Sequence, residues 1–204
     1  MSISFSGRKM FTVYLLVAGS LLLSVVAIAR GRLLNLSGIL LKDSAQNTIQ
    51  LSDTDSNSYF VFVFLSPECP ISQQYTLTLN ALAKNNHARF YGVIPGNFYD
   101  AATINEFKKK YNIIFPLLMD TNMKLTKSLG ASITPQAVVV QHNDIMYSGA
   151  IDNAYVSLGK KQSSTTAYYL KDALLAIQNK ELVRIKKTNA VGCLIELNTP
   201  AYKN

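Results

Sequence analysis

The sequence has few of the residues that bind metals or crosslink a small scaffold. Among its 204 residues there are two cysteines, two histidines and no tryptophan. Two cysteines form at most one disulfide, which excludes a mini-protein held together by several bridges. A four-ligand zinc site that includes cysteine would need both cysteines and both histidines. The chain is long enough to bury a hydrophobic core without such supports.

Charged residues are also scarce, at 16% of the chain, and basic residues outnumber acidic ones by 20 to 12. Residues 1–32 contain four basic residues and no acidic one, so residues 33–204 carry only half of the net charge of +8. A nucleic-acid surface interleaves basic residues with exposed aromatic ones, whereas the aromatic residues here fall at inward positions of the expected helices and strands. We therefore expect no nucleic-acid partner.

An uncharged run fills residues 10–29, with the sequence MFTVYLLVAGSLLLSVVAIA. Twenty residues rise about 30 Å as a helix, which is the thickness of a bilayer core. Two basic residues precede the run, and Ala27-Ile28-Ala29 would serve as a signal-peptidase site. We expect residues 1–32 to be a signal peptide or a transmembrane anchor, in preference to a buried core helix. Either role places residues 33–204 outside the cytoplasm, on the periplasmic side in a bacterium, where disulfide chemistry is permitted.

The rest of the chain alternates strand-like and helix-like patterns. Tyr59–Leu65 is a run of seven apolar residues, which predicts a central strand buried on both faces. A helix is expected over Pro70–Lys84, because proline fits its first turn. Thr103 and Glu106 form a capping box for another helix. Further strands are expected at 36–41, 48–51, 89–94, 115–119, 136–141 and 145–149, and further helices at 103–111, 122–129 and 163–179. This order predicts an α/β fold with a central mixed sheet flanked by helices.

Cys69 stands where the central strand gives way to the first long helix, in Ser66-Pro67-Glu68-Cys69-Pro70-Ile71-Ser72. Free N–H groups at a helix N-terminus stabilise a thiolate and lower the pKa of the thiol. The carboxyl end of a strand is also where α/β sheets place their sites. We therefore expect Cys69 to be an exposed, reactive nucleophile rather than a buried structural cysteine, although Glu68 opposes a negative charge there.

Together these features resemble the thioredoxin-like redoxin family of the alkyl hydroperoxide reductase/thiol-specific antioxidant type, which includes membrane-anchored and exported proteins. The resemblance rests on the order of elements, on Cys69-Pro70-x-Ser72, and on Ile133-Thr134-Pro135 before a strand. It implies a thioredoxin-like domain over residues 33–180, followed by a basic tail over 181–204. Pro135 matches the cis proline of that family, and Thr134 and Pro135 would then receive the backbone of an extended substrate.

The chain departs from the motifs of this family in several places. The second cysteine of Cys-x-x-Cys is replaced by Ser72, whose hydroxyl can hydrogen-bond a thiolate but cannot resolve a mixed disulfide. Val63 stands where thioredoxins have a buried carboxylate. Ser66 matches the hydroxyl residue that peroxiredoxins place before their reactive cysteine, but their proline and arginine have no counterpart. A generic redoxin therefore fits the sequence better than a classical peroxiredoxin.

Cys193 lies in the tail, 124 positions after Cys69, so any pairing between them is tertiary. Three roles stay open for it: a resolving thiol that attacks a mixed disulfide or a sulfenic acid, a partner in a structural disulfide, or a thiol unpaired within this chain. The preceding Gly192 permits a sharp bend.

The sequence favours an extracytoplasmic thiol–disulfide oxidoreductase with antioxidant chemistry, in which Cys69 attacks a protein disulfide or a peroxide. An external thiol reductant would regenerate it, and no metal or organic cofactor is required. The candidate residues are Cys69, Ser72 and Cys193 for catalysis and Ser66, Pro70, Thr134 and Pro135 for substrate binding. One alternative is a non-catalytic binding module that recognises a partner through the Pro135 face, and a weaker one is a copper-handling protein.

Overall fold

The computed structural model describes residues 34, 36, 38–51 and 59–196 of the chain. The uncharged run at residues 10–29, which the sequence predicts to be a signal peptide or an anchor, lies outside these residues. Within the described part, no helix combines the length and apolar character that a membrane span requires.

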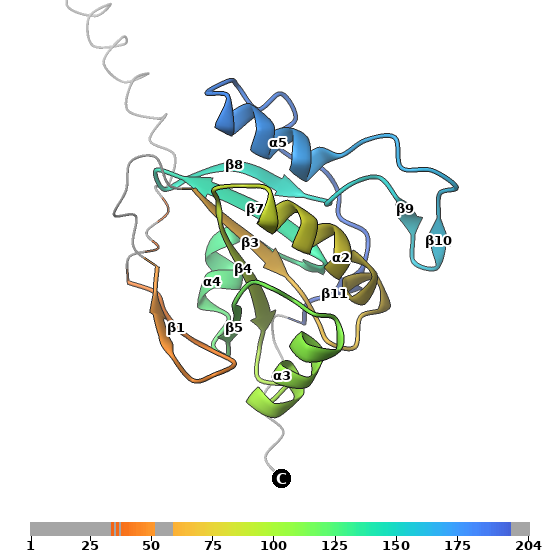
Figure 1. Cartoon of the computed structure of the whole chain (residues 1–204). Coiled ribbons are helices and arrows are strands. Elements are labelled where there is room, and N and C mark those ends of the chain that lie inside the picture. The colour runs from red at the N-terminus through yellow and green to blue at the C-terminus, as the bar shows by residue number, and fades with distance from the viewer. Residues whose placement is uncertain (1–33, 35, 37, 52–58, 197–204) are drawn as a thin grey trace, which may run out of the picture. The chain divides into compact units, whose positions relative to one another are not determined.

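Seven strands form one mixed sheet in the order β2-β1-β5-β4-β3-β7-β8 (Figure 1). The central strand β3 (Phe60–Phe64) runs parallel to β4 and antiparallel to β7, and all five of its residues are buried, as its apolar run predicts. The other strands of the sheet are β1 (Leu40–Asp43), β2 (Thr48–Gln50), β4 (Arg89–Pro95), β5 (Leu117–Asp120), β7 (Gln136–Gln141) and β8 (Asp144–Gly149). The expected strand at 36–41 starts only at Leu40, because Ile39 N–H donates to the Leu36 carbonyl and closes a turn.

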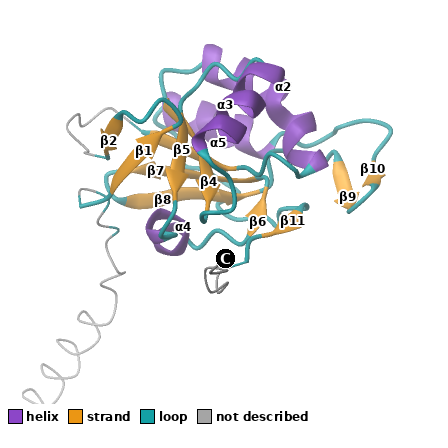
Figure 2. Cartoon of the chain, turned by 90° about the horizontal axis from the view of Figure 1, so that it is seen from below, coloured by secondary structure: helices purple, strands orange, loops and turns teal. Residues whose placement is uncertain are grey.

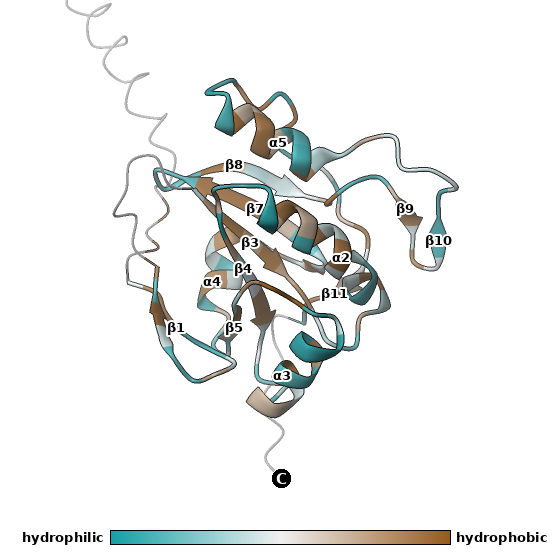
Figure 3. Ribbon diagram, viewed as in Figure 1, coloured by the Kyte–Doolittle hydropathy of each residue, from teal (hydrophilic) through white to brown (hydrophobic). Residues whose placement is uncertain are grey.

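Helices cover both faces of the sheet, and Figure 2 shows α2, α3 and α5 on one side with α4 on the other. Their bounds are α2 (Pro70–Lys84), α3 (Ala101–Lys110), α4 (Lys124–Leu129) and α5 (Tyr169–Gln178). Alternate residues of β3 supply the two cores: Val61 and Val63 pack under α2, α3 and α5, whereas Phe60, Phe62 and Phe64 pack on the side of α4. In Figure 3 the strands at the centre of the sheet are largely apolar, and the helices mix apolar and polar residues.

The predicted bounds of α2 are confirmed, but those of α3 differ. This helix begins at Ala101 because the carboxylate of Asp100 accepts the N–H of Thr103 at 2.8 Å and its hydroxyl at 2.7 Å. Asp100 is therefore the N-cap residue, and the predicted capping box of Thr103 with Glu106 is wrong.

The last helix, α5, begins at Tyr169 and not at residue 163 as predicted. The side-chain oxygen of Asn153 accepts the N–H groups of Thr166 and Ala167, each at 3.0 Å. These bonds hold the stretch before Tyr169 in a loop, and its run of serine and threonine residues has little helix propensity of its own.

After α5 the chain returns to the sheet twice. Lys187 forms a parallel bridge with Ser148 at the edge of β8. The short strand β11 (Cys193–Leu194) then pairs antiparallel with β6 (Ile133–Thr134), and Figure 2 shows these two strands side by side. A separate hairpin of β9 (Tyr155–Ser157) and β10 (Lys160–Lys161) precedes α5. The described part of the tail therefore runs to the end of the sheet from which α2 departs.

Candidate active site

Cys69 is the N-cap residue of α2, and Pro70 occupies the first turn of the helix as the sequence predicts. The loop from β3 is closed by a hydrogen bond from the Cys69 N–H to the Ser66 carbonyl at 3.2 Å. The side chain of Cys69 is only 2% exposed, so the expectation of an exposed cysteine is wrong. The reason lies in the tail, because Cys193 on β11 contacts the Cys69 sulfur.

The two cysteine sulfurs lie 2.7 Å apart, and both cysteines are free thiols in this structure. Pairing of β11 with β6 produces this approach, since it sets Cys193 opposite Thr134. The Cys69 thiol in turn faces the Thr134 carbonyl, with 3.1 Å between sulfur and oxygen. Residues 124 positions apart in sequence therefore meet at one point beside β6.

The peptide bond between Thr134 and Pro135 is cis, as the resemblance implies. Thr134 contacts both cysteines. Its carbonyl oxygen accepts a hydrogen bond from the Cys69 thiol, and its hydroxyl donates to the Cys193 carbonyl at 3.4 Å. The backbone beside the cis proline is thus already paired with a strand of the same chain.

The surroundings of Cys69 favour its thiolate. Burial raises its pKa, but hydrogen bonds from the Cys193 thiol and from the backbone N–H and hydroxyl of Ser72 lower it, and the pKa is lowered overall. Ser72 is buried, and its oxygen accepts the Ser66 N–H at 3.3 Å, which leaves its proton for Cys69. Ser72 therefore supports a thiolate although it cannot resolve a disulfide.

The pKa of Cys193 is shifted in the opposite direction. Burial raises its pKa, and so do the hydrogen bond to Cys69 and the negative charge there, to about 11. At neutral pH Cys193 is consequently a thiol, and its proton is donated to the Cys69 sulfur. The pair consists of one activated sulfur and one sulfur kept protonated by its neighbour.

Residues 36–148, which include Cys69 and Pro135 but not Cys193, match the AhpC/TSA family. The chain belongs to this family. No functionally curated protein matches the sequence.

The fold of this AhpC/TSA member is shared with several solved structures. A hypothetical protein from Sinorhizobium meliloti is 20% identical with a TM-score of 0.70, over 83% of this chain and 97% of that one. An uncharacterised conserved protein from Geobacillus kaustophilus is 18% identical with a TM-score of 0.68, over 83% and 96%. DsbF from Mycobacterium tuberculosis, a structure in mixed oxidised and reduced forms, is 17% identical with a TM-score of 0.53, over 70% and 96%. At these identities the likeness establishes a thioredoxin-like fold.

Three polar side chains near Cys69, those of Ser66, Glu68 and Tyr99, are linked by hydrogen bonds that the sequence did not predict. The hydroxyls of Ser66 and Tyr99 lie 3.0 Å apart, and Tyr99 also donates to the Glu68 carboxylate at 3.3 Å. A pocket of about 400 Å³ opens here, and its lining includes Ser66, Glu68, Phe98, Tyr99, Thr134 and Cys193. Tyr99 follows a different strand, so no local motif connects it to Cys69.

A second polar group holds the β9–β10 hairpin against α2. The buried Tyr75 donates its hydroxyl proton to the Asp152 carboxylate, and burial and this bond raise the pKa of Tyr75. The Tyr75 and Tyr155 rings lie 5.6 Å apart, and the Tyr155 hydroxyl donates to Gln74. Burial and, to a smaller extent, the charges of Asp152 and Cys69 raise the pKa of Tyr155.

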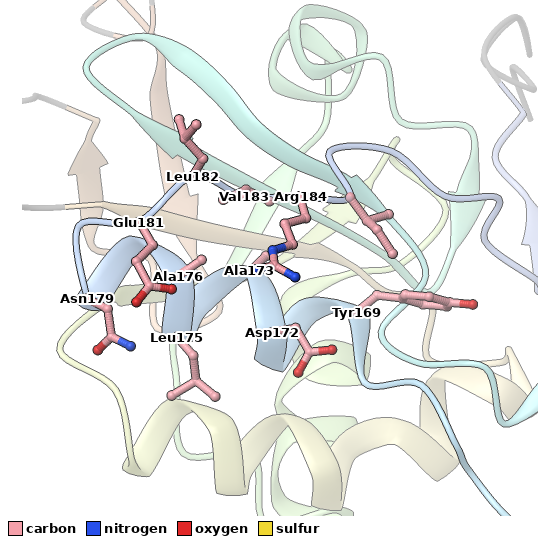
Figure 4. A pocket seen from close by; sticks show the side chains of 11 residues that line it. Tyr169, Asp172, Ala173, Leu175, Ala176, Asn179, Glu181, Leu182, Val183 and Arg184 are labelled. Atoms are coloured by element: carbon pink, nitrogen blue, oxygen red, sulfur yellow. The ribbon is translucent and has the colours of Figure 1, made fainter.

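Other features of the family member lie away from the cysteines. A pocket of about 340 Å³ lies between α5 and the segment after it, lined among others by Tyr169, Asp172 and Arg184, and it includes neither cysteine (Figure 4). Among the described residues, no group of three or more histidine, cysteine, aspartate or glutamate side chains could hold a metal ion.

Proposed function

We propose that this protein is a thiol–disulfide oxidoreductase in which Cys69 is the nucleophile and Cys193 is the resolving thiol. Family and fold support a thiol oxidoreductase in general. The observation that carries the specific proposal is the 2.7 Å approach of two free thiols whose pKa values are shifted in opposite directions.

The first step is an exchange at Cys69. Its thiolate attacks one sulfur of a substrate disulfide, a Cys69–substrate disulfide forms, and the other substrate sulfur leaves as a thiolate that takes up a proton. With a peroxide, the thiolate instead attacks oxygen, so that Cys69 becomes a sulfenic acid and the second oxygen leaves as water or alcohol. Hydrogen bonds from Ser72 and Cys193 hold the attacking thiolate.

The second step uses Cys193. The Cys69 charge contributes to its raised pKa, and that charge disappears once Cys69 has formed a bond to the substrate. Cys193 then loses its proton more readily and attacks the Cys69 sulfur, which forms a Cys69–Cys193 disulfide. The leaving group is the second substrate thiolate from a mixed disulfide, and water from a sulfenic acid. An external thiol reductant returns both cysteines to thiols, and the two electrons it supplies replace those that the cysteine pair gave to the substrate.

The remaining candidate residues position the substrate. Thr134 and Pro135 offer the backbone edge next to Cys69, and Ser66 lines the adjoining pocket. Pro70 follows Cys69 and starts α2, so it contributes to the shape of the surface that a substrate meets.

We place this chemistry outside the cytoplasm, with residues 1–32 as a signal peptide or transmembrane anchor, residues 33–180 as the redoxin domain and residues 181–204 as the tail. The uncharged run at residues 10–29 and the basic residues before it support this location. A retained run would attach the domain to the membrane.

One observation favours a second candidate, a non-catalytic binding module. Cys69 is buried and the edge beside the cis proline is already filled by β11. In that role the two cysteines would fasten the tail, and a partner would recognise the face around Pro135 without exchange.

The two functions differ in turnover. We would assay the reduced full-length chain and its Cys69→Ser and Cys193→Ser variants with insulin disulfides and with hydrogen peroxide, in the presence of a dithiol. We expect Cys69→Ser to fall to the uncatalysed rate. Mixed with insulin disulfides in the absence of the dithiol, Cys193→Ser should accumulate a Cys69–substrate disulfide. Absence of exchange in the unaltered chain, or full activity of Cys69→Ser, would contradict the oxidoreductase proposal.

A further inference from the structure

The tail is anchored to the main sheet at Thr188. Its N–H donates to the Ser148 carbonyl at 3.1 Å, and its hydroxyl oxygen accepts the Ala150 N–H at 2.9 Å and lies 2.6 Å from the Tyr147 hydroxyl. Gly149 allows this approach, because a Cβ there would lie 2.8 Å from the Thr188 nitrogen. The described chain beyond this anchor, residues 189–196, is called the strap below.

The strap lies along β6 as an added strand. Cys193 is paired with Thr134 and Leu194 with Ile133, and the Ile195 N–H donates to the Ser132 carbonyl at 2.8 Å. An extended polypeptide that adds to an exposed strand edge makes the same kind of backbone pairing. The strap also presents its own cysteine sulfur 2.7 Å from Cys69, where a sulfur under attack would lie.

The residue before the strap cysteine has a strict size limit. A Cβ on Gly192 would lie 2.7 Å from the Thr134 carbonyl carbon and closer still to its oxygen, both of which are backbone atoms that cannot yield without moving the strand. The sequence suggests a bend as the reason for this glycine, but close approach of two backbones explains it.

The two residues after Cys193 differ in how closely they pack against the rest of the protein. Leu194 is 80% exposed, so its side chain is hardly constrained. Ile195 packs against the apolar cluster on the α4 face of the sheet. Contacts to β6 and to the apolar cluster on the α4 face therefore define a pattern of glycine, cysteine, any residue and a branched aliphatic residue.

We propose that the strap is a built-in copy of the substrate, and that the edge of β6 binds extended polypeptides with this glycine–cysteine–any–aliphatic pattern once the strap has moved away. The inference rests on the proposed function of Cys69. The exchange forms a Cys69–peptide disulfide, breaks the earlier disulfide of the peptide cysteine, and leaves its former partner as a thiolate, so that no net oxidation occurs.

Competition between strap and substrate follows from this arrangement. Cys69 is covered while the strap is in place. A Gly192→Ala substitution sets a methyl group against the Thr134 carbonyl and so favours the state in which the strap has left.

The test uses full-length Cys193→Ser, in which a mixed disulfide at Cys69 cannot be resolved. The probe is the peptide TNAVGCLIE, the sequence of residues 188–196, with its cysteine bonded to nitrothiobenzoate, whose release reports the exchange. The control peptide has alanine in place of the glycine. We expect the glycine peptide to react about tenfold faster or more, a difference of about 1.4 kcal/mol in the barrier. Because only the peptide changes, folding of the protein does not enter this comparison.

A second comparison tests the competition. The Gly192→Ala/Cys193→Ser variant should react about tenfold faster than Cys193→Ser, both with the glycine peptide and with hydroxyethyl disulfide, because each reagent reaches Cys69 only after the strap has left. Equal rates in the two variants would show that the strap does not compete with disulfides for Cys69. Circular dichroism establishes that both variants are folded.

The outcomes separate the two proposals. Equal rates for the glycine and alanine peptides, with a reactive Cys69 towards hydroxyethyl disulfide, overturn the inference about the strap and leave the oxidoreductase proposal standing. Failure of Cys69 to react with any of these disulfides overturns both.

Discussion

The two cysteines meet at one point but belong to regions that are built differently. Cys69 follows the fully buried strand β3 and begins a helix of 15 residues, so rigid elements hold it on both sides. Cys193 lies on a strand of two residues, attached to a strand that is equally short.

This difference matches the two tasks that the proposed function gives to the sulfurs. A nucleophile gains from a fixed position, because hydrogen bonds from Ser72 can then stabilise its charge without reorganisation. A resolving thiol must leave while a substrate is bound and return afterwards, and a segment with few buried contacts opens at low cost. If the strap and the strand–helix junction differ in this way, substitutions in the strap should change the return of Cys193, and substitutions at the junction should change the reactivity of Cys69.

The largest expected effect is on the return of the strap. Gly192→Ala should slow formation of the Cys69–Cys193 disulfide after oxidation by about a hundredfold, since a displacement on the order of 1 Å is enough for such a loss. Stopped alkylation followed by mass spectrometry measures the rate. Gly38→Ala is the matched control, because a Cβ there meets no atom within 4 Å, and it should leave the rate unchanged. A similar rate in both variants would show that the strap tolerates a side chain at Gly192.

The next effect concerns the anchor of the strap. Thr188→Val removes the oxygen that accepts the Ala150 N–H and pairs with Tyr147, which should lower the free energy of unfolding by about 1–3 kcal/mol. Urea denaturation measures this loss. Thr165→Val, whose hydroxyl has no hydrogen bond within the described residues, should change the stability by less than about 0.5 kcal/mol. Equal stability of the two variants would argue that Thr188 is not an anchor.

At the junction, Ser72→Ala should act on both stability and reactivity. It leaves the Ser66 N–H without its side-chain acceptor, at a cost of about 1–3 kcal/mol in the free energy of unfolding. It also removes a donor to the thiolate, so the pKa of Cys69 should rise. Iodoacetamide alkylation of Cys69 as a function of pH reports this shift, and an unchanged profile would exclude a contribution from the Ser72 hydroxyl.

The smallest expected effect is the contribution of the strap to the Cys69 pKa. Cys193→Ala removes a donor and should move the alkylation profile to higher pH, whereas Cys193→Ser retains a hydroxyl donor and should move it less. Equal profiles for the two variants would show that this hydrogen bond does not stabilise the thiolate.

The pH dependence of stability has a definite sign for each cysteine. Because folding lowers the pKa of Cys69, its contribution is present above the pKa of an unfolded thiol and is lost as the pH falls through the folded value. Folding raises the pKa of Cys193 to about 11, so its contribution is present below the unfolded pKa and is lost as the pH rises toward that value.

The same two regions show how far the sequence alone can lead. The strand at Tyr59–Leu65 and the helix at Pro70–Lys84 depend on local patterns of apolar residues and on proline, and both were predicted with bounds close to those observed. The place of Cys69 at a helix N-terminus follows from the same patterns.

Properties that depend on distant segments were not predictable in this way. Cys69 is buried because residues 124 positions away cover it, and Gly192 is required by a backbone that belongs to β6. Tyr99 reaches Ser66 and Glu68 from another strand end. Such contacts leave no periodic pattern in the sequence. The presence of a second cysteine nevertheless indicated that Cys69 and Cys193 could pair.

The central claim is that Cys69 and Cys193 form one redox pair, and disulfide mapping after oxidation tests it most directly. The reduced full-length chain would be treated with one equivalent of hydrogen peroxide, digested without reductant and examined by mass spectrometry. The account predicts a Cys69–Cys193 disulfide within one chain. A disulfide between two chains, or a Cys69 that is oxidised while Cys193 stays a free thiol, would contradict it.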